Sequence, residues 1–417
     1  MSAPFSRKGR LVSRLGNGCL FLLGLGTALA LGELLLRAFP NWIPAEVRVS
    51  PPVRRVRAFV DETYEVRLSD GDLFHWMRGA IAPLAPDQDT VVAQVHMVTD
   101  AHGFRNSPPE QATYDIVALG DSFTRASGVA TPWPQRLSEW TGLDVLNLAD
   151  VGAGPQQELE FLQEFGVNKH PQWVIMAYCG ANDLHDAAAY QQARPFLLAR
   201  FGRYLLTRGG EVWQTSTPSS AQALVESGFR YPITMRIEDT DLEMAFFSAY
   251  LGWLAVSGEV IESSQDYRIA RDAILATRES SEEMDARLLL VYIPSKEHIY
   301  LPYLEDVETA GRVFADVPTL AQDEAGFLEF TSRPATHELA LRHMDDQANL
   351  LADFAEDQGM AFLNLTPTFR EAAGTGVELY YPFDTHWNQQ GHDLAAQTIA
   401  SYMERMAMVT HKERRGE

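Results

Sequence analysis

Apolar runs of strand length alternate with amphipathic stretches along most of the chain, from residue 114 onward. Five runs are nearly continuous in apolar residues and bounded by Gly, Pro, Asp or Asn: Ile116–Leu119, Val145–Leu148, Trp173–Tyr178, Leu288–Ile293 and Ala361–Leu365. Such runs are typical of parallel strands buried on both faces. Helical patterns accompany them: Trp133–Trp140, Gln156–Phe165, His337–Glu356 and Gln389–Met406. The alternation predicts an α/β fold with a doubly wound, mostly parallel five-stranded sheet, whose site lies at the carboxyl ends of the strands.

Two regions precede or interrupt this rhythm. Residues 41–113 are Pro-rich and irregular, with alternating stretches such as Thr90–Val98, and predict a stalk followed by a small β-rich lead-in. Residues 185–285 separate the third predicted strand from the fourth and include helical material such as Leu242–Val256. We expect this segment to be a large helical insertion that caps the site, since loops at that sheet edge carry function. The α/β domain is then expected to span 114–410.

One part of the insertion is basic although the chain is acidic. Arg194–Arg208 contains four arginines and no acidic residue, interleaved with Phe and Leu. The pattern fits a packed helix with solvated arginines, or a surface that rests on a membrane or attracts an anionic substrate.

Residues 1–40 carry a targeting pattern. Basic residues from Arg7 to Arg14 precede the apolar run Leu15–Gly32, which is close to the roughly 20 residues that span a bilayer. Ala28-Leu29-Ala30 resembles a signal-peptide cleavage site, and a buried core helix would show the same apolar run. We expect an inner-membrane anchor with the catalytic domain outside the cytoplasm, in the periplasm of a Gram-negative host, because the basic flank stays inside.

The formal net charge of −22 argues against a nucleic-acid partner, because phosphate contacts need a basic surface. The hydrophobic content of 46% supplies a sizeable core. The two cysteines, Cys19 and Cys179, lie in separate apolar runs, so no disulfide framework is expected.

The candidate chemistry begins at the end of the first strand, in the sequence DIVALGDSFTR of residues 115–125. Ser122 follows the strand where the chain must turn, which exposes a hydroxyl at the edge of the sheet where sites form. Ser122 is either a helix cap, which needs no distant partner, or a nucleophile, which needs a base, an orienting acid and an oxyanion site.

The base candidate is His386, two residues after Asp384 and before the last predicted helix, whose N-cap we expect to be Asn388. A tight loop can place the Asp384 carboxylate on one ring nitrogen of His386 and leave the other for Ser122. The order Ser, Asp, His is one of several that build a triad.

Two segments after strands could supply oxyanion donors. Residues 147–154, NLADVGAG, end the second strand with glycines that let backbone N–H groups approach a ligand, and Gly154 competes with Gly152 for this role. Residues 180–183, GAND, end the third strand and place the Asn182 carboxamide at the same edge.

These blocks, in this order, resemble the SGNH or GDSL-like hydrolase superfamily: Gly120-Asp121-Ser122, Gly152, Gly180-Ala181-Asn182-Asp183, and Asp384 with His386. The resemblance implies a flavodoxin-like SGNH fold over about 114–405. It implies Ser122 as nucleophile and His386 as general base, oriented by Asp384. It also implies the Ser122 N–H, the Gly152 N–H and the Asn182 side chain as oxyanion donors.

The departures from the common pattern narrow the resemblance. Asp384 and His386 are separated by one residue, whereas many members have two. The Asp-x-His-Trp-Asn form resembles a membrane-anchored, extracytoplasmic branch that includes the alginate O-acetylation proteins, which implies acyl transfer to or from polysaccharide. Residues 293–300, IPSKEHIY, end the fourth strand and either add Lys296, His298 or Tyr300 to the pocket or form a surface loop.

The sequence therefore predicts a serine-dependent ester hydrolase without cofactor, acting through an acyl-enzyme on O-acetyl groups of envelope glycans or similar esters. An O-acyltransferase to a polysaccharide, or a non-catalytic envelope binding protein on this fold, are the alternatives. A metal site of Asp384, His386 and His392 is the rival chemistry, but the spacing of the two histidines across a helix start suits one ion poorly. We expect His392 to support the loop.

Overall fold

Five parallel strands form the central sheet of the computed structural model, which describes residues 7–39, 58–193 and 228–415. In spatial order β11-β8-β5-β3-β4, their bounds are Ala361–Asn364, Arg287–Ile293, Trp173–Cys179, Ile116–Gly120 and Val145–Asn147. Each of the five predicted apolar runs is one of these strands. The predicted doubly wound α/β sheet is confirmed.

The register of the sheet brings the functional segments to one edge. Every residue of β3 is buried, and β3 pairs with β5 up to Gly120 and Ala177. The next pair, β5 with β8, ends at Cys179 and Ile293. Because the strands are parallel, the segments that follow Gly120, Cys179 and Ile293 lie side by side.

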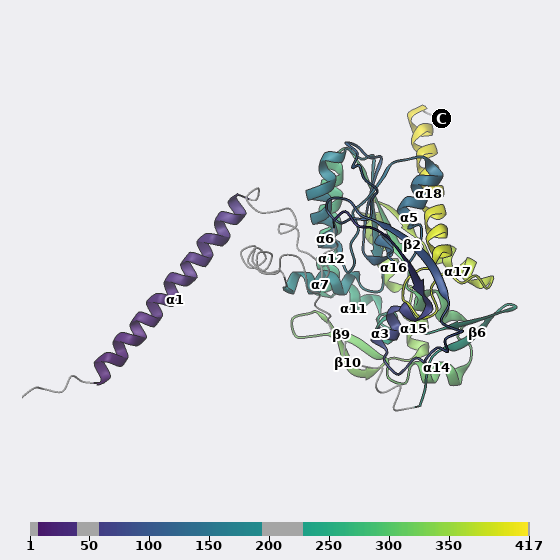
Figure 1. Ribbon diagram of the computed structural model, residues 1–417, viewed down its shortest axis with the longest axis horizontal. Coiled ribbons are helices and arrows are strands. Elements are labelled where there is room, and N and C mark those ends of the chain that lie inside the picture. The colour runs from purple at the N-terminus through teal and green to yellow at the C-terminus, as the bar shows by residue number, and fades with distance from the viewer. Residues whose placement is uncertain (1–6, 40–57, 194–227, 416–417) are drawn as a thin grey trace, which may run out of the picture. The chain divides into compact units, whose positions relative to one another are not determined.

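Helices cover both faces of the sheet. Figure 1 shows α6 and α12 on one side and α5 and α18 on the other, and each pair is in contact. The apolar stripes of these helices face the strands, as in α12, where Tyr267, Ala270 and Ile274 are buried. The main covering helices are α5 Trp133–Thr141, α6 Pro155–Phe161, α12 Gln265–Glu283, α16 Asp346–Asp357 and α18 Gln389–Arg415.

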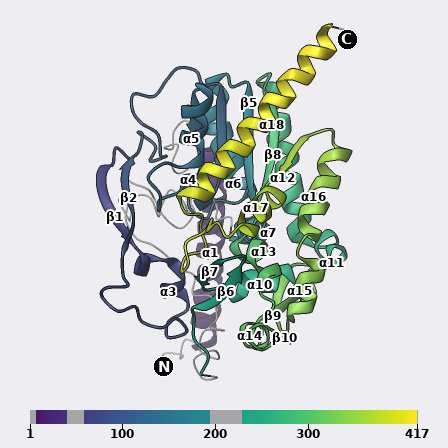
Figure 2. The ribbon, with the colours of Figure 1, turned by 90° about the vertical axis from the view of Figure 1, so that its right-hand side faces the viewer.

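The lead-in from residue 58 onward is a β-hairpin with a short helix between its strands. β1 (Asp61–Arg67) pairs antiparallel with β2 (Val91–Val98), and α3 (Asp72–Trp76) lies between them in sequence. Figure 2 shows β1, β2 and α3 along one flank of the sheet domain, in the same compact unit.

Two predicted helices differ in the structure. The stretch His337–Glu356 forms two helices, α15 (His337–His343) and α16, because Asp345 at the break binds His298 and Arg370. The stretch Leu242–Val256 begins as a strand, β7 (Thr240–Met244), and only then becomes helix α10 (Ser248–Leu254). The buried residues of β7 alternate and pair with β6 (Ile233–Ile237), so the period is two and not 3.6.

The remaining α-helices and strands of the described residues are short. They are α4 Ser122–Arg125, α7 Asp183–Ala193, α11 Gly258–Glu262, α13 Lys296–Tyr300, α14 Val307–Val313, β9 Pro318–Gln322, β10 Leu328–Pro334 and α17 Thr366–Gly374. The basic stretch Arg194–Arg208 lies outside the described residues.

The N-terminal segment is one helix, α1 (Arg7–Ala38), which belongs to a separate compact unit. Its part Leu20–Ala38 has a mean hydropathy of 1.7 and is long and apolar enough to cross a membrane. A membrane anchor and a signal sequence both have this form.

Candidate active site

The turn after β3 explains the Gly-Asp-Ser block residue by residue. Gly120 has a φ of 152°, and a Cβ there would lie 2.2 Å from Thr124 Oγ1, so a side chain is excluded. Asp121 is the N-cap of α4, and its Oδ1 accepts a hydrogen bond from the Phe123 N–H at 2.9 Å. Ser122 is the first helical residue. The cap is therefore Asp121, and the Ser122 hydroxyl is left for another partner.

That partner is His386. The Ser122 Oγ lies 2.7 Å from His386 Nε2, and His386 Nδ1 lies 2.6 Å from Asp384 Oδ1. With the Nδ1–H donating to Asp384, Nε2 is free to accept the serine proton. The structure thus brings Ser122, His386 and Asp384 into one hydrogen-bonded chain, although 264 positions separate Ser122 from His386 in the sequence. The His386 side chain is 30% exposed, so a substrate can reach it.

The loop that carries Asp384 and His386 is held in a tight turn. Asp384 Oδ1 also accepts from the backbone N–H of His386 at 2.8 Å, which is why one intervening residue suffices. Asn388 Oδ1 accepts from the N–H groups of Gln390 and Gly391, so it caps the start of α18. Phe123 packs against the His386 ring at 5.0 Å. The hydrogen bonds within the loop and the packing of Phe123 therefore hold the His386 ring in place.

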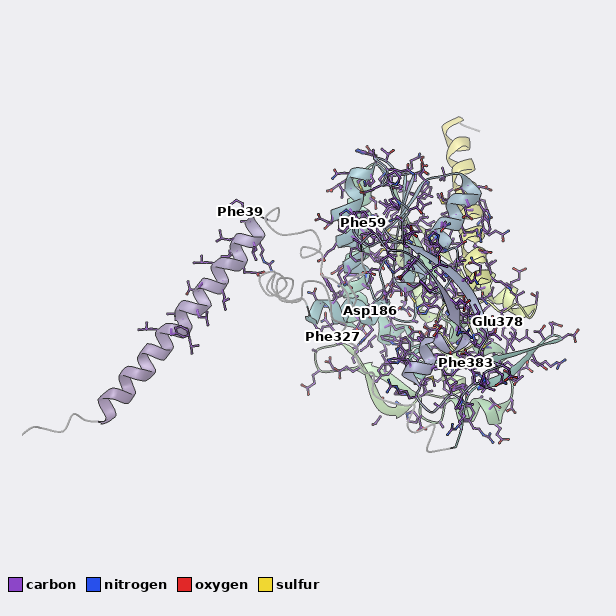
Figure 3. The ribbon with its side chains drawn as sticks, in the orientation of Figure 1. Phe39, Phe59, Asp186, Phe327, Glu378 and Phe383 are labelled. Carbon is purple, nitrogen blue, oxygen red and sulfur yellow. The ribbon has the colours of Figure 1, made fainter. Side chains whose placement is uncertain are left out.

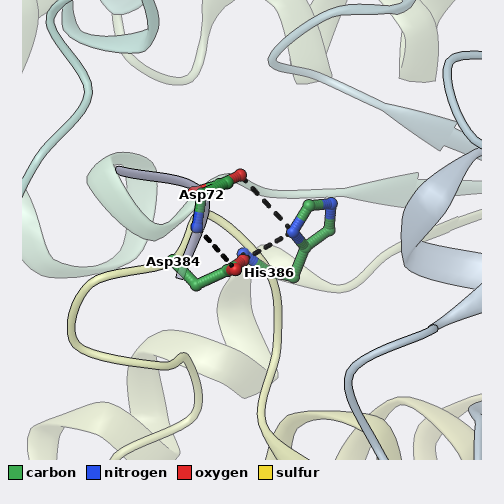
Figure 4. Close-up of side chains that lie close together, drawn as sticks. All are labelled: Asp72, Asp384 and His386. Carbon is green, nitrogen blue, oxygen red and sulfur yellow. Dashed lines mark hydrogen bonds and ion pairs between the residues drawn. The ribbon is translucent and has the colours of Figure 1, made fainter. Parts of the chain in front are cut away.

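A second carboxylate, which the sequence reasoning missed, lies beside His386. Asp72 from α3 places its Oδ2 3.6 Å from His386 Nδ1, and its backbone N–H donates to Asp384 Oδ2 at 3.0 Å (Figure 4). Its carboxylate accepts from Thr385 N–H at 3.0 Å and from Thr385 Oγ1 at 2.6 Å. No local pattern distinguishes Asp72 from Asp70 in the sequence, and no signal could have found it.

The charges of this group shift one another. Burial lowers the pKa of His386, but the carboxylates of Asp384 and then Asp72 outweigh it and raise that pKa to about 9. Burial raises the pKa of Asp384, but His386 and its hydrogen bonds bring it down to about 2. Burial, followed by the Asp384 charge, raises the pKa of Asp72 to about 7.

Gly152 and Gly154 have different roles in the turn after β4. Gly152 has a φ of 70°, and a Cβ there would meet open space. A Cβ on Gly154 would lie 3.0 Å from both Ala187 N and Asp186 Cβ, so this glycine serves the packing against α7. Among the described residues, neither the Ser122 N–H nor the Gly152 N–H has a hydrogen-bond acceptor. Both N–H groups are thus available to a ligand.

Asn182 lies at the end of β5, but its carboxamide is engaged. Its Nδ2 donates to Asp121 Oδ2 at 3.2 Å and to Asp186 Oδ2 at 2.9 Å. Its buried Oδ1 has no partner among the described residues. Turning the amide over would direct the oxygen at two carboxylates, which is favourable only when these carry protons. Gly180 beside it is required because a Cβ there would lie 2.1 Å from the Tyr292 hydroxyl.

The three residues from segment 293–300 neither form a surface loop nor line a pocket. Lys296, His298 and Tyr300 lie on α13 and are all 0% exposed. Lys296 Nζ donates to the carbonyls of Tyr381, Pro382 and Asp384, at 3.3, 3.1 and 2.8 Å. The other two bind elsewhere: His298 to Asp345, and the Tyr300 hydroxyl to the Val377 carbonyl and the Leu379 N–H. Lys296 therefore supports the loop that carries Asp384 and His386.

The capacity of the site for a cation is limited by its own hydrogen bonds. Asp72, Asp384 and His386 each offer a ligand atom within 4.8 Å of the others. All four oxygens of the two carboxylates already accept from protein donors, so these atoms do not form a vacant ligand set. His392 is outside this group: it is 1% exposed, and its Nδ1 accepts from the Trp133 N–H at 3.3 Å. Burial lowers the pKa of His392 to about 3, so it stays neutral, and its ring contacts that of Trp387, the residue after His386.

Part of the chain that carries this site is similar to a known protein family. Residues 332–416 match the family model described as an SGNH hydrolase-like domain of the acetyltransferase AlgX. The resemblance to the SGNH superfamily is thereby confirmed. The matched segment contains Asp384 and His386 of the candidate site, whereas Ser122 lies outside it. No curated protein matches the chain.

The solved structures to which this chain is similar are distant from it. A catalytic mutant of an acetylxylan esterase from Geobacillus stearothermophilus is 10% identical, covers 70% of this chain and 95% of its own, and has a TM-score of 0.33. An α/β hydrolase from the metagenome of Lake Arreo is 13% identical, with coverages of 70% and 96% and a TM-score of 0.35. A GDSL-like lipase from Bacteroides thetaiotaomicron is 12% identical, covers 70% of this chain and 88% of its own, and has a TM-score of 0.29. At these values nothing about substrate follows.

Proposed function

We propose that this protein is a serine-dependent enzyme that cleaves ester bonds and transfers their acyl group through Ser122. The observation that carries the proposal is the hydrogen-bonded chain from Ser122 Oγ through His386 to Asp384, with links of 2.7 and 2.6 Å. These distances are within the reach that a base needs to take a proton from a nucleophile.

In the first half-reaction, His386 Nε2 takes the Ser122 proton as Oγ bonds to the carbonyl carbon of an ester. The carbonyl electron pair moves to oxygen, and the Ser122 and Gly152 N–H groups, with the Asn182 amide, receive this oxyanion. One such donor is typically worth about 2.7–4 kcal/mol of barrier. When the oxyanion collapses, the ester C–O bond breaks and His386 returns the proton to the leaving alcohol.

In the second half-reaction an acceptor attacks the acyl carbon. Water gives a free acid and makes the protein an esterase, whereas a sugar hydroxyl gives a new ester and makes it an O-acyltransferase. In both cases the acceptor proton passes to His386 Nε2 and then to Ser122 Oγ as the acyl-enzyme breaks. The transferase is favoured as second candidate because the matched family model is that of an acetyltransferase and covers the acid and the base.

The substrate we propose is an O-acetyl ester of an envelope glycan or a similar small ester. The description of the matched family supports the acetyl group. The acidic net charge of −22 supports a partner that is not a nucleic acid.

We propose that α1 anchors the protein in the inner membrane and that the Ser122 domain lies outside the cytoplasm. The apolar segment Leu20–Ala38 and the preceding basic residues support this orientation. Protease added to spheroplasts is expected to digest the Ser122 domain, and extraction at alkaline pH is expected to leave the protein in the membrane. A domain that resists protease until lysis would contradict the orientation.

The activity is tested with the full-length protein in detergent. Release of p-nitrophenol from acetyl, butyryl and octanoyl esters is followed with and without an oligosaccharide acceptor, beside Ser122→Ala. The exposed Ser107→Ala is the control and should retain full activity. Loss of release in Ser122→Ala alone establishes the nucleophile, and acetylated oligosaccharide identifies a transferase. Equal release by folded wild type and Ser122→Ala would refute the proposal and favour a binding protein.

A further inference from the structure

The lead-in makes a continuous contact with the loop that carries the acid and the base. The Leu73 N–H donates to the Phe383 carbonyl at 3.2 Å, and the next contacts join Asp72 to Asp384 and to Thr385. A Cβ on Gly71 would lie 2.2 Å from the Phe383 oxygen, so the two backbones touch. The Phe74 ring packs against Phe383 at 4.9 Å, and Figure 3 labels Phe383 in the catalytic domain. The lead-in therefore packs directly against the loop of the candidate site.

Through this contact the Asp72 carboxylate comes close to the imidazole of His386, the proposed base. The Asp72 side chain is 16% exposed, and its carboxylate faces Thr385, His386 and Asp384. The separation of 3.6 Å from His386 Nδ1 is too long for a hydrogen bond, but at that distance a charge in a partly buried site interacts strongly.

We propose that Asp72 is a positioning residue for the acyl-transfer reaction: a second carboxylate, supplied by the lead-in, that acts through His386. This inference rests on the proposed function of Ser122. The chain would then use a tetrad, in which Asp384 orients the imidazole by a direct hydrogen bond. Asp72 holds Thr385 and stabilises the imidazolium that forms when His386 takes the serine proton.

The direction in which loss of the Asp72 charge should change the pKa of His386 follows from the charged groups around the imidazole. When ionised, the carboxylates of Asp384, Asp72 and Asp121 favour the protonated ring, in that order of strength. The Lys296 ammonium, which binds carbonyls of the same loop, interacts electrostatically with Asp72 and Asp384, and the buried His392 is neutral. Removing the Asp72 charge therefore leaves one fewer carboxylate on His386, and the free base forms at lower pH.

The test is the rate of Ser122 labelling by a fluorophosphonate probe between pH 6 and pH 10, in the full-length protein. Labelling requires neutral His386, so its rise with pH reports the pKa of the base. In Asp72→Asn this rise should move to lower pH by about 1 unit or more, the shift that one nearby charge typically causes. The limiting rate at high pH should fall by about tenfold or more, within the contribution of a general base. Asp72→Glu keeps the charge and should restore the position of the rise.

Asp61→Asn is the control. It removes an exposed carboxylate of the same hairpin, and this carboxylate contacts His96 and not His386. A residue with only a structural role would lower the labelling rate without moving the pH at which it rises, and Asp72→Glu would then behave like Asp72→Asn. An unshifted rise in Asp72→Asn overturns the inference, and so does an Asp72→Glu variant that behaves like Asp72→Asn, provided that each variant has the unfolding midpoint of a folded protein. A wild type that does not label at all refutes the proposed function instead.

If Asp72→Asn does not fold, Asp384→Asn decides the question. With Asp72 as the remaining carboxylate, labelling of this variant should still rise well above the ordinary histidine pKa of about 6.5. A rise at or below that value would show that Asp72 has no influence on His386 and would overturn the inference.

Discussion

The base side and the oxyanion side of the candidate site are built to different degrees of completeness. On the base side, the loop of Asp384 and His386 is held by Asp72 and Lys296, and both carboxylates have donors on each oxygen. On the oxyanion side, Asn182 directs both of its amide hydrogens at carboxylates and leaves Oδ1 without a partner among the described residues. The base is thus preorganised, whereas one of the proposed donors is not.

The difference has an electrostatic origin. Asn182 binds two of four buried carboxylates on the oxyanion side, and burial is the main cause that raises the pKa of each: Asp121, Glu158, Asp183 and Asp186. Repulsion from neighbouring carboxylates raises the pKa further for all of them except Asp121. Neither oxygen of Glu158 has a partner among the described residues, and the residue is 0% exposed. Protonation is the way such groups avoid an unpaired buried charge. The base side uses charge, and the oxyanion side works best with its carboxylates neutral.

Asp384→Asn should produce the largest effect, because it removes the contact that orients the base. We expect kcat/KM for p-nitrophenyl acetate to fall by about 10⁴-fold, the loss seen when a triad acid becomes an amide. The thermal unfolding midpoint should change little, since the amide fills the same space. Full activity in this variant would mean that Asp72 alone orients His386 and would invert the ranking of the two carboxylates.

Asn182→Ala tests whether the less complete side contributes to the reaction. Loss of an oxyanion donor typically lowers kcat by about 10²–10³-fold. The KM for the ester should stay near the wild-type value, because the interaction strengthens only in the transition state. A kcat within twofold of wild type would show that the amide stays bound to Asp121 and Asp186 during the reaction.

Lys296→Met tests the support beneath the base. Methionine fills similar space but leaves the carbonyls of Tyr381, Pro382 and Asp384 without their buried donor. We expect the free energy of unfolding to fall by about 2–3 kcal/mol, measured by urea titration. Lys169→Met is the control: this lysine pairs with Glu110 and donates to the Gln111 carbonyl. Both acceptors belong to exposed residues that water can reach, so its loss should cost less than about 1 kcal/mol. Equal losses in the two variants would show that the buried ammonium offers no special support.

The parts of the molecule that depend on local pattern could be predicted, and the parts that depend on distant contacts could not. The strands and the meeting of Ser122 with His386 follow from apolar runs and from the shared edge of a parallel sheet. Asp72 could not be found, because its partner Asp384 lies 312 positions away and α3 has no distinguishing sequence. Lys296 follows a buried strand, as site residues do, but its ammonium binds backbone carbonyls of the loop that carries His386. The break at Asp345 is set by His298 and Arg370, which helical periodicity does not record.

The smallest expected effect concerns the pH dependence of stability on the oxyanion side. Burial, and then the Asp121 charge, raises the pKa of Asp186 to about 7 from an ordinary value of 3.8. The folded state therefore holds a proton that the unfolded chain has lost, and stability decreases as pH rises through this window. Asp186→Asn cannot ionise, so its unfolding midpoint relative to wild type should be higher at pH 8 than at pH 5. The exposed Asp272→Asn should show the same difference from wild type at both pH values. If Asp186→Asn also shows a constant difference, Asp186 is ionised throughout, and the contrast between a charged base side and a neutral oxyanion side fails at this residue.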